Sequence, residues 1–243
     1  MSLLDRLRGQ PSWQHDDPDI RASAVDDLEN DAQDLLTAIA TEDTDAGVRL
    51  AAVSRLVDPV VIARVATHDA ADEVRREASA MLRAIAIDAN DDETAGAALS
   101  GLTEARDLGE VARVAKLESV SQSALERLQS AKAIGAVARR ATHRLVRDAA
   151  LARLDDRDEL LAVAVKSDHR EVALAAFERL AANGANDRDM LKTIVVRART
   201  KPVSRRARLA LNALEAQPVV PTPVELRDRR DALCDRVNEL LGW

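Results

Sequence analysis

Residues 117–142 read LESVSQSALERLQSAKAIGAVARRAT, and residues 143–168 read HRLVRDAALARLDDRDELLAVAVKSD. The two stretches match at the same places, and Val120, Val146 and Val172 therefore follow one another at intervals of 26 residues. Each valine is followed by alanine four residues later and by leucine eight residues later, and an arginine precedes each leucine. Self-similarity at a fixed step is typical of a stacked-repeat architecture, in which each unit packs only on its neighbours.

The same pattern extends over eight units, each with an anchor residue, alanine at +4 and leucine at +8. At about 100° per residue, these positions share one face of a helix, which we expect to be buried. An alanine on that face lets the neighbouring helix approach closely, and a larger side chain there should cost about 1–3 kcal/mol. The eight sets are Ile20/Ala24/Leu28, Val48/Ala52/Leu56, Val74/Ala78/Leu82, Thr94/Ala98/Leu102, Val120/Ala124/Leu128, Val146/Ala150/Leu154, Val172/Ala176/Leu180 and Val203/Ala207/Leu211.

Apolar residues also recur 14, 17 and 18 positions after the anchor residue, and they predict a second helix in most units. Where two successive anchors lie further apart than 26 residues, this apolar set is displaced by a few residues. In the third unit these positions are aspartates, Asp88, Asp91 and Asp92. We therefore expect that this unit has lost its second helix and that its first helix continues through Ile87. Asp88–Glu93 would then form a surface turn at a bend or break in the stack.

These patterns predict an all-α fold, a right-handed α-solenoid of about eight short two-helix repeats over residues 16–216, after a lead-in over residues 1–15. Residues 217–224 read QPVVPTPV, and three prolines in eight residues indicate an extended linker. Residues 225–243 are expected to form an amphipathic helix, which is marginal alone at this length. It should therefore dock on the array, pair with another chain, or begin a longer helix. Its apolar side carries Leu226, Leu233, Val237, Leu240 and Leu241.

The composition favours close helix packing without aromatic side chains, because the chain has one Phe, two Trp and no Tyr. Cys234 is the single cysteine, which excludes an internal disulfide and fits a reducing cytosol, and we expect it to be a small buried hydrophobe. The N-terminus lacks the apolar core of a signal peptide. No run of about 18 apolar residues occurs, so we expect a cytoplasmic protein that does not span a membrane.

Charge is distributed unevenly along the chain. Residues 1–130 carry 13 Lys and Arg against 26 Asp and Glu, whereas residues 131–243 carry 22 against 16. Two segments of the second half, residues 132–147 and 190–214, are basic and contain no acid. Clustered cations of this kind suit an acidic protein, phosphates or a solvated cap. The candidate anion-binding or partner-binding residues are Lys132, Arg139, Arg140, Arg144, Arg147, Lys192, Arg197, Arg199, Lys201, Arg205, Arg206 and Arg208.

The arginines that precede the +8 leucines, Arg127, Arg153 and Arg179, recur at the edge of the buried face and should form a ladder along the stack. The structural interpretation is that each binds a carboxylate of an adjacent turn, such as Asp155 or Asp156. A further row follows the anchor residues and is expected to pair with turn acids such as Asp19, Asp45 and Asp72. That row comprises Arg21, Arg49, Arg75 and Arg147.

Residues 17–28, DPDIRASAVDDL, and residues 47–56, GVRLAAVSRL, resemble HEAT-type (armadillo-like) α-solenoid repeats, which usually run to about 40–47 residues and are shortened here. The opening LLDRLRGQPSWQHDDPDIR is similar to bacterial proteins of domain-of-unknown-function family 349, as are the segments KPVSRRAR and RRDALCDRV. The resemblance implies a HEAT-like front end that precedes a long coiled-coil-rich region, which would lie beyond Trp243. It implies no reaction.

No nucleophile elbow, phosphate-binding glycine loop or dinucleotide fingerprint occurs in the sequence, and the four histidines lack further ligands at metal-binding spacing. We therefore predict no catalytic residue, no cofactor and no metal. The preferred function is a non-catalytic scaffold for protein–protein interaction. The alternative is sequence-independent RNA or DNA binding through the basic half, without aromatic side chains for base stacking. A remote analogy is with HEAT-like DNA glycosylases and bilin lyases. The oligomeric state stays open.

Overall fold

The computed structural model describes residues 11–182, 187–216 and 223–242, and all the regular structure in these ranges is helical, which confirms the all-α class. A 3-10 turn, η1 (Ser12–Gln14), precedes the helices. The helices are α1 (Pro18–Asp26), α2 (Gln33–Glu42), α3 (Ala46–Val53), α4 (Pro59–His68), α5 (Asp72–Asp88), α6 (Asp92–Ser100), α7 (Ala105–Val114), α8 (Glu118–Arg127), α9 (Ala131–Arg140), α10 (Arg144–Ala152), α11 (Arg157–Lys166), α12 (Arg170–Ala182), α13 (Arg188–Arg197), α14 (Lys201–Ala216) and α15 (Pro223–Leu241).

Short polar side chains start many of these helices. The Asp17 side chain accepts a hydrogen bond from the Asp19 N–H, and Pro18 supplies the first helical residue, where its missing N–H costs nothing. Asp45, Asp58, Asp91, Ser130, Asp156 and Asp187 cap later helices in the same way. Many of the acids in this chain are therefore used to begin helices.

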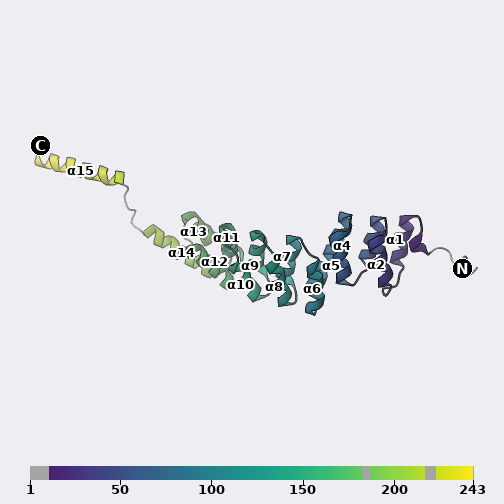
Figure 1. Cartoon of the computed structure of the whole chain (residues 1–243). Coiled ribbons are helices and arrows are strands. Elements are labelled where there is room, and N and C mark those ends of the chain that lie inside the picture. Colours follow the sequence, from purple (N-terminus) through teal and green to yellow (C-terminus); the bar gives the residue numbers. More distant parts are fainter. Residues whose placement is uncertain (1–10, 183–186, 217–222, 243) are drawn as a thin grey trace, which may run out of the picture.

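The helices α1–α14 form an elongated row of two layers, in which each helix packs on its immediate neighbours (Figure 1). The first helices of the units, α1, α3, α5, α6, α8, α10, α12 and α14, follow one another in one layer. The second helices, α2, α4, α7, α9, α11 and α13, form the other layer, with α5 contacting α7 across the place where one second helix is missing.

The eight alanines at the +4 position form the seam between the layers. Ala24 is 8% exposed, and the other seven are fully buried. The leucines at +8 are nearly all buried, but their location differs from the prediction: Leu56, Leu102, Leu128 and Leu154 come after the last residue of the first helix. They turn the chain into the second helix instead of extending the helical face. Ile20, an expected anchor, is 41% exposed because it lies in the terminal helix.

In the third unit, α5 runs for 17 residues to Asp88 and the next helix, α6, begins at Asp92. The end of α5 takes the place of a second-helix end. The Lys116 N–H donates to the Ile87 oxygen at 2.9 Å, just as the Thr142 N–H donates to the Arg113 oxygen at 2.8 Å one unit later. The stack therefore continues through this unit.

At the C-terminal end, α14 packs on α12 and α13. The helix expected over residues 225–243 begins earlier, at Pro223, and makes no extensive contact with the described part of the array (Figure 1). Residues 1–10, 183–186 and 217–222, which include most of the lead-in, the expected loop after α12 and the expected linker, lie outside the described residues. Among the helices described, none has both the length and the apolar character needed to cross a bilayer.

Candidate binding surface

In the first two units, an arginine–aspartate pair ties the first helix to the turn that leads into the next unit. Arg21 in α1 donates from Nε and Nη2 to the two carboxylate oxygens of Asp43, both at 2.8 Å. Arg49 in α3 binds Asp69 in the same way, at 2.7 and 2.9 Å. Asp43 and Asp69 end the second helices α2 and α4, so each pair links a first helix to the turn before the next one. These hydrogen bonds hold the pKa of both carboxyl groups below its ordinary value.

The prediction named other acids for this arginine row, and it is correct only in part. Arg75 pairs with Asp72, as expected. Asp45 is not available to Arg49, because its Oδ1 accepts the N–H groups of Gly47 and Val48 and caps α3. The partner of Arg49 is instead an acid 20 residues away.

Arg147 in α10 directly follows the anchor residue of its unit, as Arg49 does in α3. It has no carboxylate partner among the described residues. Its Nη1 donates to the backbone oxygens of Ala141 and Thr142 at 2.7 and 2.9 Å. The residue that ends α11 is Ser167, where the front units have aspartate. Burial and the charge of Arg147 together lower the pKa of the nearby His169. The expected acid partner of Arg147 is therefore wrong.

The predicted ladder residues bind backbone oxygens of the preceding unit. Arg127 donates to the oxygens of Leu99 and Leu102. Arg153 donates to those of Leu125 and Leu128, the latter at 2.7 Å. Arg179 donates to the Leu151 oxygen and to Asp155 at 3.1 Å. The expected carboxylate is thus present only for Arg179, because the carbonyl groups at the end of each first helix lack helical partners and accept these guanidinium groups.

Half of the candidate anion-binding residues are used within the fold. The basic segments contain no acid of their own, but neighbouring units supply carboxylates: Glu159 binds Arg139 at 2.8 Å, and Asp168 binds Arg199 at 2.8 Å. Arg144 binds Glu171 at 2.8 Å, Arg206 binds Glu178, and Lys192 lies 3.8 Å from Asp189. With Arg147 on backbone oxygens, these six are held by internal contacts.

The other six candidates are exposed and make no hydrogen bond or ion pair with another described residue. They lie at the ends of α9 and α13 and along α14, and they are Lys132, Arg140, Arg197, Lys201, Arg205 and Arg208. In α14, Val203 and Ala207 are buried against the preceding unit, so Arg205 and Arg208 face outward. We call this set the free cations.

A groove of about 440 Å³ lies beside two of the free cations, Lys201 and Arg205. Arg170 at the start of α12 lines it too and has no partner among the described residues. The remaining lining residues are Pro202, Arg206 and Leu209. Leu209 is 61% exposed, and Val196 beside Arg197 is 82% exposed. The groove therefore combines four cations with an uncovered apolar side chain and has no acid in its lining.

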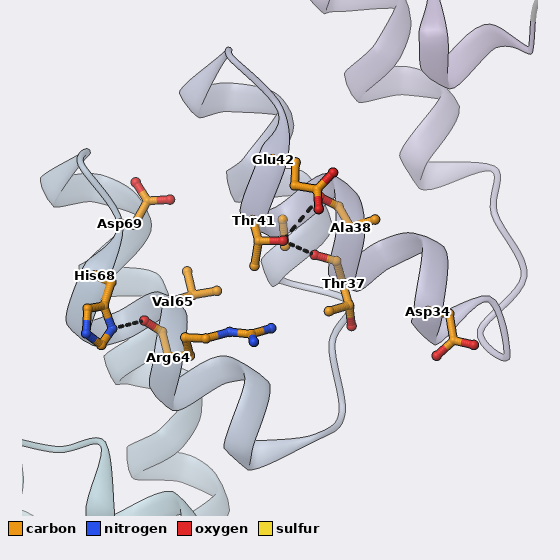
Figure 2. Close-up of a pocket in the computed structure, with 10 residues that line it drawn as sticks. Asp34, Thr37, Ala38, Thr41, Glu42, Arg64, Val65, His68 and Asp69 are labelled. Atoms are coloured by element: carbon orange, nitrogen blue, oxygen red, sulfur yellow. Dashed lines mark hydrogen bonds between the residues drawn. The ribbon is translucent and has the colours of Figure 1, made fainter.

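A second groove, of about 540 Å³, lies between α2 and α4 at the other end of the molecule (Figure 2). Its side chains are mixed in charge, with Asp34 and Glu42 against Arg64. Figure 2 shows two of its polar side chains hydrogen-bonded to their own helices: the Thr41 hydroxyl donates to the Thr37 oxygen at 2.8 Å, and His68 Nδ1 lies 3.0 Å from the Arg64 oxygen. The groove between α2 and α4 is therefore lined by charges of both signs, whereas the charged side chains that line the groove beside α14 are all cations.

The remaining reactive side chains are dispersed. Across the described residues, no three His, Cys, Asp or Glu side chains gather as they would around a metal ion. His143 Nε2 lies 2.9 Å from the Ala115 oxygen, in contact with the preceding unit. Cys234 is exposed on α15, which corrects the expectation that it is buried.

Neither a scan of the chain against protein-family models nor a search of curated proteins finds a match. The surface beside α14 is therefore interpreted from its geometry and charge alone.

Proposed function

We propose that this chain is a non-catalytic scaffold, a right-handed α-solenoid of about eight short HEAT-like repeats, that binds an acidic protein partner in the cytoplasm. The proposed family relationship is the one carried by the sequence resemblance to family 349 proteins. The arrangement of α1–α14 supports a repeat array, because the eight units share the alanine seam and because Arg127, Arg153 and Arg179 each repeat the same contact to the unit before.

The single observation that carries the binding proposal is the groove beside α14. Most arginines of the front half are held by carboxylates or carbonyl groups, whereas the free cations at the other end have no internal partner. Unpaired cations at a surface keep their full capacity for charge-assisted hydrogen bonds to an incoming carboxylate. Leu209 adds exposed apolar area to the same groove, as expected where arginine and apolar side chains together form a protein interface.

Sequence-independent RNA or DNA binding is the second candidate, and the same free cations favour it. Two observations weigh against it. The one phenylalanine, Phe177, is 5% exposed within the core, so no described aromatic ring on this surface is offered to a base. The exposed Leu209 and Val196 also contribute nothing to a phosphate contact.

The test uses the full chain, a fluorescent 20-residue peptide of alternating glutamate and leucine blocks, and an RNA duplex of matched charge. We expect the double variant Lys201→Glu/Arg205→Glu to lose about tenfold or more in affinity for the peptide. The matched control is Arg64→Glu/Arg106→Glu, which reverses two exposed arginines at a distance from α14 and should bind like the parent.

Equal affinity of the two double variants, or no binding of the peptide by the parent, contradicts the proposal. Tighter binding of the RNA that falls about 1000-fold between 50 and 200 mM salt would instead support the nucleic-acid candidate, since that slope corresponds to roughly six phosphate contacts.

A further inference from the structure

Helix α15 carries an apolar stripe that no described part of the chain covers. Leu226, Leu233 and Leu240 lie seven residues apart, and Val237 follows Leu233 by four. At about 100° per residue these four side chains fall within roughly 60° of one another, as in the contact seam of a coiled coil. They are between 51% and 82% exposed. Leu226, Leu233 and Val237 also line a shallow groove of about 480 Å³ along the helix, together with Cys234, Asn238 and two neighbouring arginines.

The charges of α15 are sorted around this stripe. Arg229 and Arg236 border one edge of the stripe, and Arg230 borders the other edge. The carboxylates Asp228, Asp231, Asp235 and Glu239 gather on the opposite side, centred roughly 170° away from the stripe. Arg230 contacts Asp231 at 2.6 Å, whereas Arg229 and Arg236 have no partner among the described residues. Among the side chains that the structure describes, those that border the apolar seam and carry a charge are therefore positive.

This arrangement selects among the surfaces that could cover the stripe. The part of the array nearest to α15 is its last unit, since residues 217–222 can extend by at most about 25 Å. That unit carries the free cations Arg205 and Arg208, which would face the arginines of α15. A second copy of α15, parallel or antiparallel, would likewise place arginines against arginines along the seam.

An anionic membrane surface fits less well than a helix. A lipid surface attracts the whole helix by its net charge, and in α15 the four arginines, Arg227 included, are balanced by at least as many carboxylates. A partner helix, by contrast, contacts only the seam and its two borders, where the charge is positive.

We infer that α15 is a docking helix for an acidic amphipathic helix of another protein, whose apolar seam meets Leu226, Leu233, Val237 and Leu240 and whose bordering Glu or Asp side chains meet Arg229 and Arg236. This binding element is separate from the groove beside α14, and it depends on different side chains.

The test titrates the full chain carrying Lys201→Glu/Arg205→Glu, so that the groove beside α14 does not compete for an acidic peptide, into two labelled helical peptides of about 21 residues with a leucine seam, one bordered by glutamates and the other by lysines. Fluorescence anisotropy should give the acidic peptide at least about tenfold tighter binding. Leu233→Asp/Val237→Asp should abolish this binding. Arg229→Glu/Arg236→Glu should reverse the preference in favour of the lysine peptide. The matched control Asp228→Lys/Asp235→Lys changes two charges on the opposite side and should keep the preference for the acidic peptide.

Equal binding of the two peptides overturns the inference. So does dimerisation of the chain alone that Leu233→Asp/Val237→Asp removes in sedimentation, or binding to phosphatidylserine vesicles with neither peptide bound. Because Lys201→Glu/Arg205→Glu is present throughout this test, failure of the groove proposal leaves its outcomes unchanged. The groove itself is tested in a chain that carries Leu233→Asp/Val237→Asp, in which α15 no longer offers its apolar stripe.

Discussion

Arg49 and Arg147 begin from the same position in their units, one residue after a buried valine, and they reach different partners. Arg49 meets the carboxylate of Asp69, whose side chain is 5% exposed, and Arg147 meets only backbone oxygens. The difference lies in the residue that ends the second helix, which is aspartate in the first two units and Ser167 behind Arg147.

The packing of the helices is the same in spite of this difference, since Ala52 and Ala150 are equally buried in the two units. The alanine seam therefore maintains the stack, and the polar position between units is free to change. The front units pair arginine with the aspartate that ends their second helix, while the back of the array leaves the six free cations without a partner among the described residues. This contrast is the reason why we propose binding at α14 and not at the front units.

The largest effect is expected for a variant that places an arginine in the middle of the array, at the position that the ladder arginines hold in later units. Gly101 occupies the position of Arg127 and Arg153, but a Cβ atom there would lie 2.5 Å from the Ala63 Cβ and 2.8 Å from the Ala63 Cα. Gly101→Arg should therefore destabilise the chain by about 3 kcal/mol or more, measured by urea unfolding. Gly96→Arg, within α6 and with no atom within 4 Å of its added Cβ, should be harmless. Equal stability of the two variants would contradict the close approach of α4 and α6.

The next effect compares Arg49 with Arg147 directly. Arg49→Met leaves the Asp69 carboxylate nearly buried with only the Ala71 N–H as its remaining short contact, and should cost about 2–3 kcal/mol. Arg147→Met strands no carboxylate and should cost about 1 kcal/mol or less. Thermal and urea unfolding of both variants, with Arg106→Met as an exposed control, measure the difference. A larger loss for Arg147→Met would mean that the carboxylates do not set the contrast.

Acid should weaken the front contacts in particular. The folded-state pKa of Asp43 and Asp69 lies below the ordinary carboxyl value of 3.8. Their contribution to stability is therefore complete above that value and is lost as the pH falls below it, toward the folded-state pKa. Asp43→Asn/Asp69→Asn should lower stability at pH 7 by about 1–2 kcal/mol and flatten the fall below pH 3.8. Asp26→Asn, at an exposed position, is the control and should change neither.

Much of the fold follows from the sequence, because a small residue every 26 positions is needed wherever two helices approach closely. The class, the alanine seam and the long α5 were all accessible in this way. The placement of the +8 leucines after the helix end could not be predicted in this way. A buried leucine eight residues after the anchor gives the same sequence pattern whether it lies in a turn or on the helix. The signal that could have separated them is the capping residue two positions later, Ser130 after Leu128 and Asp156 after Leu154, which requires the first helix to have ended.

The candidate surface was accessible only in part. The sequence identifies the basic segments, but it does not show that Glu159 reaches Arg139 or that Asp168 reaches Arg199, because these pairs join different units. The arginine ladder has no sequence signal for its acceptors, which are backbone oxygens. The pairs of Arg21 with Asp43 and Arg49 with Asp69 do recur at offsets of 22 and 20 residues, and this near-repeat could have been found.

The smallest expected effect concerns the back half, where a histidine is near the position that aspartate holds in front. Burial and the charge of Arg147 lower the pKa of His169 from its ordinary value of 6.5, and Asp168 opposes this shift. The neutral form is therefore favoured in the folded chain, so this contribution to stability is complete above pH 6.5 and is lost as the pH drops through the folded-state pKa. Arg147→Met should raise the pKa of His169 in an NMR titration, whereas Arg153→Met, which removes a charge from the same unit, should not. If neither variant moves the titration, burial alone sets the shift, and the front and back contacts differ only in their hydrogen bonds.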